Sequence, residues 1–145
     1  MSRRIVSEHP LKRSLAGVPV DESLDPAEGW GDETAGMAVQ WIVTDSTVGA
    51  EQHVVGLTVF QPGAKHRAHR HPNAEEAQYL ITGQGLALVG DVEIEQRAGD
   101  TVFVPRNEWH GFEATGEAET VMIWTYGGAA SLEAAGYVPR ERDGS

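Results

Sequence analysis

Residues 63–83 read GAKHRAHRHPNAEEAQYLITG and hold the most unusual residue pattern of the chain. Three of the six histidines fall in the six positions from His66 to His71. His69 and His71 are two residues apart, so on extended backbone both imidazoles point to one face, where they can chelate an ion. His66 is at odd spacing from both, which predicts the opposite face, at the surface or behind the ligands. The alternative is a solvated basic loop that grips an anion.

Carboxylates follow the histidines at once. Glu75 and Glu76 precede the apolar run AQYLI, and a carboxylate at the start of a buried strand is costly unless it is paired or bound to a metal. The last histidine of the chain, His110, begins another predicted strand. Cysteine is absent, so any metal must be held by nitrogen and oxygen. Imidazoles with a carboxylate suit iron, manganese, nickel, cobalt or zinc better than magnesium or calcium.

The rest of the chain has an all-β texture from Val39 onward. Short runs rich in Val, Ile, Thr and aromatic residues alternate with turn residues. The dipeptide Gly90-Asp91 favours a two-residue hairpin turn. One short helix is predicted at Ser131–Ala135, with Ser131 as its cap and Gly136 as its end. Such a pattern predicts a barrel or a two-sheet jelly roll. The expected strands cover residues 39–44, 53–60, 76–82, 85–89, 92–96, 101–104, 111–114 and 120–126.

These residues resemble the cupin superfamily over roughly residues 56–126. The first cupin motif has a glycine, five residues, HXH, three or four residues, a glutamate, six residues and a glycine. The chain fits it throughout with Gly63, His69, His71, Glu76 and Gly83. Only Glu76, and not Glu75, keeps the six-residue spacing to Gly83.

The second cupin motif is matched with two departures. Gly99, Pro105 and His110 have the family's spacing, but Asn107 replaces a glycine and Ala114 replaces an asparagine. Asparagine tolerates left-handed backbone better than most residues, so Asn107 can serve in the turn. Ala114 lies outside the ligand set.

The resemblance implies a double-stranded β-helix, or jelly-roll barrel, in residues 38–128. A loop-rich N-terminal arm (1–37) would precede it, and a short helix and tail (129–145) would follow it. The resemblance also implies one divalent transition metal per chain, with iron or manganese favoured. Its ligands would be His69, His71, Glu76 and His110.

The function implied by this site is metal-dependent chemistry on a small molecule. A non-haem iron or manganese dioxygenase acting on an enolisable or phenolic substrate is the first expectation. The alternatives are a redox-neutral isomerase, lyase or cyclase, and a binding protein without turnover. If Glu76 points into the barrel, Gln78 and Leu80 point inward too, because they lie at even spacing from it. Gln78 is the candidate catalytic side chain. The candidate residues of the pocket wall are Gln78, Leu80 and Phe112. A hydrogen-bonded core role for Gln78 is the competing interpretation.

Composition limits the partners. The chain has 145 residues, room for one domain, and 22 acidic against 11 basic side chains give a formal charge of −11. Such acidity argues against nucleic acid. No apolar run approaches the roughly 18 residues of a membrane span, and a signal-peptide core is missing. We therefore expect a cytoplasmic protein, a homodimer by analogy with other small cupins, in which the arm covers an exposed strand edge.

Overall fold

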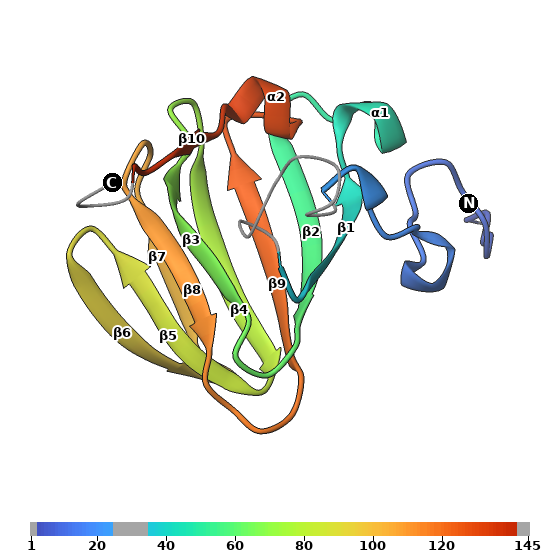
Figure 1. Ribbon diagram of the computed structural model, residues 1–145. Coiled ribbons are helices and arrows are strands. Elements are labelled where there is room, and N and C mark those ends of the chain that lie inside the picture. The colour runs from blue at the N-terminus through green and yellow to red at the C-terminus, as the bar shows by residue number, and fades with distance from the viewer. Residues whose placement is uncertain (1–2, 25–34, 142–145) are drawn as a thin grey trace.

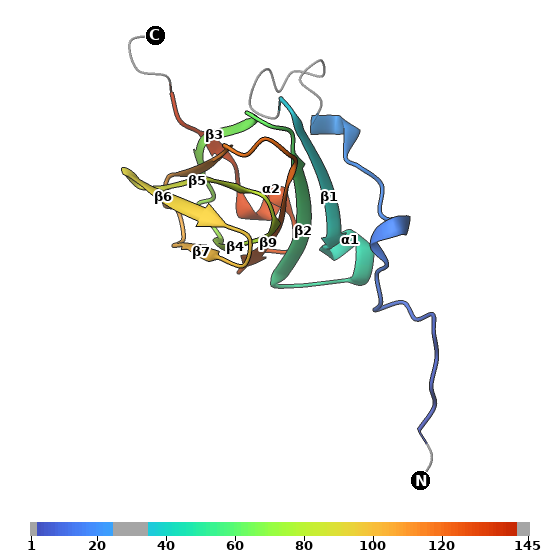
Figure 2. The ribbon, with the colours of Figure 1, turned by 90° about the horizontal axis from the view of Figure 1, so that it is seen from below.

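Two five-stranded antiparallel sheets face each other and form the body of the protein (Figures 1 and 2). The computed structural model describes residues 3–24 and 35–141. One sheet has the order β1-β2-β9-β4-β7 and the other β10-β3-β8-β5-β6, which is the jelly-roll barrel that the sequence predicts. The strands are β1 (Met37–Val43), β2 (His53–Phe60), β3 (Lys65–Arg70), β4 (Glu75–Thr82), β5 (Gln84–Val89), β6 (Val92–Arg97), β7 (Thr101–Val104), β8 (His110–Ala114), β9 (Thr120–Gly127) and β10 (Val138–Pro139).

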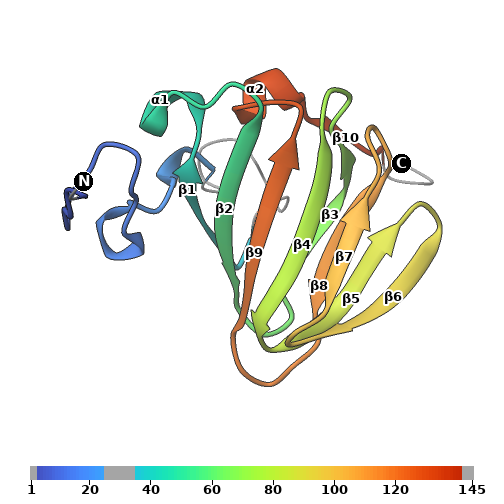
Figure 3. The same cartoon turned by 180° about the vertical axis from the view of Figure 1, so that it is seen from behind.

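The hydrophobic core lies between the two sheets. In β9, which Figure 3 shows in the middle of its sheet, every second side chain from Thr120 to Tyr126 is buried, as expected for a strand with one face on a core. Phe60 of one sheet packs against Phe112 of the other, with ring centroids 4.8 Å apart. Leu80 and Val54 are fully buried in the same core cluster. Apolar contact across the barrel therefore holds the sheets at the distance that positions the polar site.

Local features predicted from turn chemistry are confirmed. Val89 pairs with Val92 around the Gly90-Asp91 turn, where Gly90 has φ 64°. Asn107 takes a left-handed φ of 64°, the only non-glycine residue to do so in the described ranges. The helix α2 (Leu132–Ala135) begins with the Ala134 amide donating to the Ser131 hydroxyl at 2.9 Å.

The sequence did not reveal every element. Strand β3 has the sequence KHRAHR, which lacks the apolar alternation of a half-buried strand; it forms because it pairs with β8. The short strand β10 and the helix α1 (Asp45–Val48) are also unpredicted. Two 3₁₀ turns, η1 (Leu15–Gly17) and η2 (Glu22–Leu24), lie in the arm. None of the helices in the described ranges is long and apolar enough to cross a membrane.

The second half of the described arm packs against β1 of its own chain. Val20 forms a β-bridge with Gln40, and the Asp21 amide donates to the Val39 carbonyl at 2.8 Å. The indole of Trp41 donates to the Asp21 carboxylate, also at 2.8 Å. Preceding residues lead away from the barrel (Figure 2). Of the predicted arm and tail, residues 1–2, 25–34 and 142–145 lie outside the described part of the chain.

Candidate metal centre

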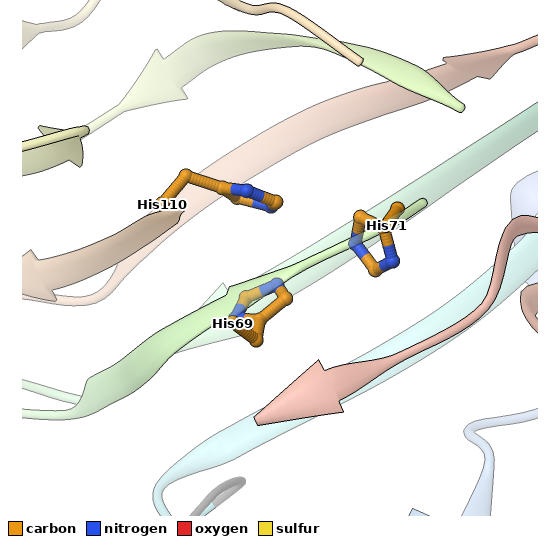
Figure 4. A group of neighbouring side chains, drawn as sticks. All are labelled: His69, His71 and His110. Carbon is orange, nitrogen blue, oxygen red and sulfur yellow. The ribbon is translucent and has the colours of Figure 1, made fainter. Parts of the chain in front are cut away.

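Three buried imidazoles come together between the sheets (Figure 4). His69 lies on β3 directly across from His110 on β8, and His71 follows the last residue of β3. Their side chains are almost completely removed from solvent. One ring nitrogen from each lies within 4.8 Å of the others. The structure thus brings together residues that are about forty positions apart in the sequence, and the three histidines could hold a metal ion.

Each imidazole is held in the tautomer that a metal requires. The Nδ1 atom of each ring lies within hydrogen-bond distance of a backbone carbonyl, and a carbonyl oxygen can only accept, so Nδ1 carries the proton and Nε2 keeps its lone pair. The pairs are His69 with Arg67 at 2.7 Å, His71 with Gly136 at 2.7 Å, and His110 with Glu108 at 3.0 Å. This arrangement is the one usually found behind histidine ligands in metalloproteins.

Glu76 brings a carboxylate to the same point. Its Oε1 atom lies 3.4 Å from Nε2 of His71 and 3.5 Å from Nε2 of His110. Its Oε2 atom accepts a hydrogen bond of 2.6 Å from the side-chain amide of Gln78. Gln78 therefore orients one oxygen of the carboxylate and leaves the other facing the imidazoles.

The donor set passes a direct test for a metal. Nε2 of His71 and Nε2 of His110 are buried and have no hydrogen-bond partner within residues 3–24 and 35–141, which is costly for a polar atom. Ligands about 2.1 Å from one ion stand about 3.0–3.4 Å apart in octahedral or tetrahedral geometry. The separations from Glu76 are close to that range. A divalent ion would supply the missing partner for both nitrogens, so the residues present are suited to bind a metal ion.

The charges in the site are strongly coupled. Burial opposes ionisation of Glu76, but the charges of His110 and His71 and their hydrogen bonds to the carboxylate together outweigh burial and hold the pKa of Glu76 well below its usual value. Burial also opposes protonation of His110, but Glu76 and Glu108 together outweigh burial, so the pKa of His110 is raised above 6.5. Burial, with the neighbouring histidines, lowers the pKa of His69 well below 6.5. Glu76 therefore favours the protonated form of His110, and His110 favours the ionised form of Glu76.

The alternation predicted for β4 explains why Glu76 is the carboxylate of the site. Glu76, Gln78 and Leu80 are buried, whereas Glu75 and Tyr79 are exposed. The buried side of the strand faces the histidines, and only Glu76 reaches them.

The placement of His66 corrects the parity argument. A β-bulge interrupts the pairing of β3 with β8 between His66 and His69, and a bulge inserts an extra residue that shifts the alternation. His66 therefore turns to the interior, where its ring stacks on His69 with centroids 4.0 Å apart. Burial, followed by the neighbouring His110, lowers the pKa of His66 to about 3.

A cavity of about 60 Å³ adjoins the histidines. Most of its wall is aromatic or aliphatic. Gln78 and Phe112 are among its lining residues. Leu80, the third residue expected there, is not; it belongs to the hydrophobic core cluster. The main side chains that sequence reasoning did not place there are Trp41, Trp124, Tyr126 and Tyr137.

Two tyrosines line this cavity. Tyr126 lies on β9 with its ring centroid 4.7 Å from that of His71, and burial, together with the nearby Glu76, raises its pKa well above 10. Tyr137 follows helix α2, and its hydroxyl lies 3.0 Å from Nε2 of His66. The inward parity of Tyr126 on a strand could have been found from the sequence. Nothing in the sequence near Tyr137 connects it with the histidines.

Comparison with known proteins agrees with this architecture. The Cupin domain family matches residues 56–126. The chain is 30% identical over 103 residues to protein SchB of Streptomyces halstedii, covering 71% of this chain and 75% of SchB. It is 33% identical over 122 residues to dimethylsulfoniopropionate lyase DddW of Ruegeria pomeroyi, covering 81% and 76%. The structure of the polyketide cyclase RemF from Streptomyces resistomycificus superposes with a TM-score of 0.68 at 18% identity, covering 99% of this chain and 89% of RemF. With this fold and both motifs in place, the chain belongs to the cupin superfamily.

Proposed function

We propose that this protein is a metal-dependent enzyme that binds one divalent transition metal through His69, His71, Glu76 and His110 and acts on a small oxygen-bearing molecule. One observation carries the proposal: two buried Nε2 atoms without a partner in the described chain face the carboxylate of Glu76 at the end of an apolar cavity. Buried polar atoms are otherwise almost always paired. We infer that the site binds a cation, which would accept the lone pairs of the two nitrogens and balance the charge of the carboxylate.

The chemistry available follows from the donors. Three neutral imidazoles and one carboxylate would reduce the charge of a divalent ion to +1, which favours an anionic oxygen ligand from the substrate. When bound, the metal would act as a Lewis acid toward that oxygen and would increase the acidity of the C–H bond next to the carbonyl or carboxylate carbon. The side-chain amide of Gln78 donates to Oε2 of Glu76 and orients the carboxylate. The carbonyls behind the rings keep the imidazoles turned inward throughout.

The cavity limits the substrate. A volume of about 60 Å³ has room for about four to six water molecules, which corresponds to a molecule of few heavy atoms. An oxygen group would lie at the histidine end, and the remainder would contact Trp41, Phe112 and Trp124. Tyr126 and Tyr137, which also line the cavity, carry neutral hydroxyl groups. Small carboxylates and carbonyl compounds meet these requirements.

Redox-neutral elimination is the reaction that these features favour. A metal held by these residues would make the C–H bond next to a coordinated carboxylate or carbonyl more acidic. Transfer of that proton to a base and departure of a β-substituent with its bonding electron pair would then form a C=C bond without an oxidant. The similarity to the lyase DddW supports this class. The small cavity supports the same choice, because it favours a short-chain substrate over a polycyclic one.

Oxygen-dependent cleavage of a small enolisable or phenolic molecule is the second candidate. It is favoured by the donor set, since three imidazoles and a carboxylate suit iron or manganese. A cavity with mostly apolar walls also keeps water away from reactive intermediates. The chain would hold the substrate in the same way in both reactions. The two reactions are therefore distinguished by which metal supports turnover and by whether turnover requires oxygen.

Metal content and oxygen dependence test the proposal together. Untagged protein is stripped with a chelator and reloaded separately with iron, manganese, cobalt, nickel or zinc. Each form is then incubated under argon or air with three kinds of substrate: small carboxylates that carry a β-leaving group, diketones, or catechols. We expect about one metal per chain, with product formed equally under argon. A product that requires air and iron or manganese would establish the second candidate. Turnover by neither route, with metal bound, would indicate a binding protein.

Variants connect this outcome to the named residues. His69→Ala and His110→Ala each remove one donor and are expected to lose most of the metal. His53→Ala is the matched control, because His53 is exposed on β2 and is expected to leave metal content unchanged. A wild-type protein that binds none of the five metals would contradict the proposal.

A further inference from the structure

The ring of His69 lies against a pair of hydrogen-bonded rings from distant parts of the chain. His66 and Tyr137 are joined by a 3.0 Å hydrogen bond between Nε2 and the phenol oxygen, and their ring planes differ by 13°. His69 stacks on both, with centroids 4.0 Å from His66 and 4.7 Å from Tyr137. Such a flat support restricts how the His69 ring can rotate. Tyr137 is outside both cupin motifs.

The residue before Tyr137 acts on a second histidine. The carbonyl of Gly136 accepts a 2.7 Å hydrogen bond from Nδ1 of His71. Two consecutive residues near the end of the chain therefore fix the rings of His69 and His71, two of the three buried histidines.

The same segment is tied to the backbone beside these histidines. Strand β10 pairs with β3 so that Pro139 lies opposite His69. The Arg140 amide donates to the Ala68 carbonyl at 3.0 Å, and the Asn73 amide donates to the Ala135 carbonyl at 3.0 Å. Because α2 has four residues and β10 two, neither is stable alone. The fold of this segment depends on the stretch that carries the ligands.

We propose that residues 131–140 form a clamp for the metal centre, in which Tyr137 and Gly136 are positioning residues that hold His69 and His71 in their ligand orientations. This inference rests on the proposed metal binding. Linkage makes the effect reciprocal: if the docked clamp favours metal binding, bound metal favours the docked clamp by the same free energy. The C-terminal segment is thus part of the metal site, although it contributes no ligand.

Hydrogen exchange of the wild-type protein tests the reciprocal effect without any substitution. Exchange is measured by mass spectrometry on metal-free protein and on protein saturated with zinc. Bound zinc is expected to slow exchange about tenfold or more at residues 136–140. The exposed strand β6 is the internal control and should change little. Equal exchange at 136–140 in both states, with zinc demonstrably bound, would overturn the clamp.

Substitution of Tyr137 tests the positioning role directly. Partners that orient metal ligands typically contribute a factor of about 10–100 in affinity, so Tyr137→Ala should weaken Co²⁺ binding by that factor and change the visible spectrum of the bound ion. Tyr137→Phe keeps the stacking ring and should restore affinity to within about threefold of wild type. Tyr79→Ala is the matched control, since Tyr79 is exposed on the outer face of β4.

The outcomes separate the two proposals. A wild-type protein that binds no cobalt contradicts the metal site itself. Normal cobalt binding by a folded Tyr137→Ala variant, with an unchanged spectrum, contradicts only the clamp. Unfolding curves of the metal-free variants identify a folding defect, in which case the exchange measurement on the wild type decides.

Discussion

The side-chain amide of Gln78 donates to Oε2 of Glu76 across 2.6 Å, while Oε1 of the same carboxylate faces two imidazoles. Both residues are buried on the inner face of β4, two positions apart. The contact gives Gln78 a defined role: it fixes the direction of a carboxylate ligand and compensates part of its charge. A side chain expected to touch the substrate therefore contacts the carboxylate of the candidate metal site.

Replacement of Gln78 by leucine should weaken metal binding. Leucine is of similar size but removes the donor, so Glu76 is free to rotate away from the histidines, and metal affinity should fall about 10–100-fold. Isothermal titration with Zn²⁺ measures the effect. Gln84→Leu, at an exposed position on β5, is the control. Full affinity in Gln78→Leu would show that the 2.6 Å contact does not orient the ligand.

Metal affinity should fall as the pH is lowered from mildly alkaline to mildly acidic. The pKa of His110 is raised above 6.5 because Glu76, although opposed by burial, favours the protonated ring. A metal must displace that proton, so below this pKa the apparent affinity should drop about tenfold per pH unit. The pKa of Glu76 is well below its usual value, so Glu76 adds no proton to this exchange near neutral pH.

Proton release on metal binding provides the check. Titrations in two buffers with different ionisation enthalpies should reveal about one proton released per metal below the pKa of His110 and close to none well above it. An affinity that does not change with pH would mean that His110 is neutral in the metal-free protein, or is not a ligand.

The cupin resemblance predicted which residues meet at the candidate metal centre because its motifs follow the spacing of residues along regular strands. Glu76 and Gln78 share the inner face of a regular strand. His69 and His71, two residues apart, are both buried although β3 ends between them at Arg70. The structure likewise confirms the turn at Gly90-Asp91, which needs only glycine's freedom at φ 64°.

The parts that the sequence did not predict depend on contacts between distant residues. A bulge in β3 places His66 on the face opposite to the one expected. The sequence of β3 lacks a clear alternation of apolar and polar residues, so it gives no sign of where the bulge occurs. Tyr137 reaches His66 across 71 positions. The interaction of the arm with β1 depends on a side-chain bond from Trp41 to Asp21. No local pattern encodes such pairs.

Replacement of Gly56 by alanine should destabilise the barrel. A Cβ at this position would lie 2.2 Å from Cζ2 of Trp124, and the indole cannot easily move because it donates to Thr58 at 2.8 Å and packs on Trp41. Overpacking of this kind costs about 1–3 kcal/mol. Thermal unfolding should show a drop of roughly 3–10 °C.

The control for this substitution is Gly17→Ala. An added Cβ at Gly17 meets no heavy atom within 4 Å, so stability should change by less than about 0.5 kcal/mol. An equal Tm for Gly56→Ala and Gly17→Ala would mean that Trp124 and the strand can relax at low cost.

Substitutions of Asn107 should distinguish its backbone role from its side-chain contact. Asn107 has φ 64°, accepts a 2.7 Å hydrogen bond from Arg70, and donates its amide to the His71 carbonyl at 3.1 Å. Asn107→Gly keeps the backbone freedom and loses an exposed side-chain bond, so stability in urea should change by less than about 1 kcal/mol. Asn107→Val adds about 1–2 kcal/mol of strain, and because the turn holds the backbone of His71, metal affinity should fall with it. Equal stability of the two variants would show that the cupin turn tolerates a β-branched residue where the family has glycine.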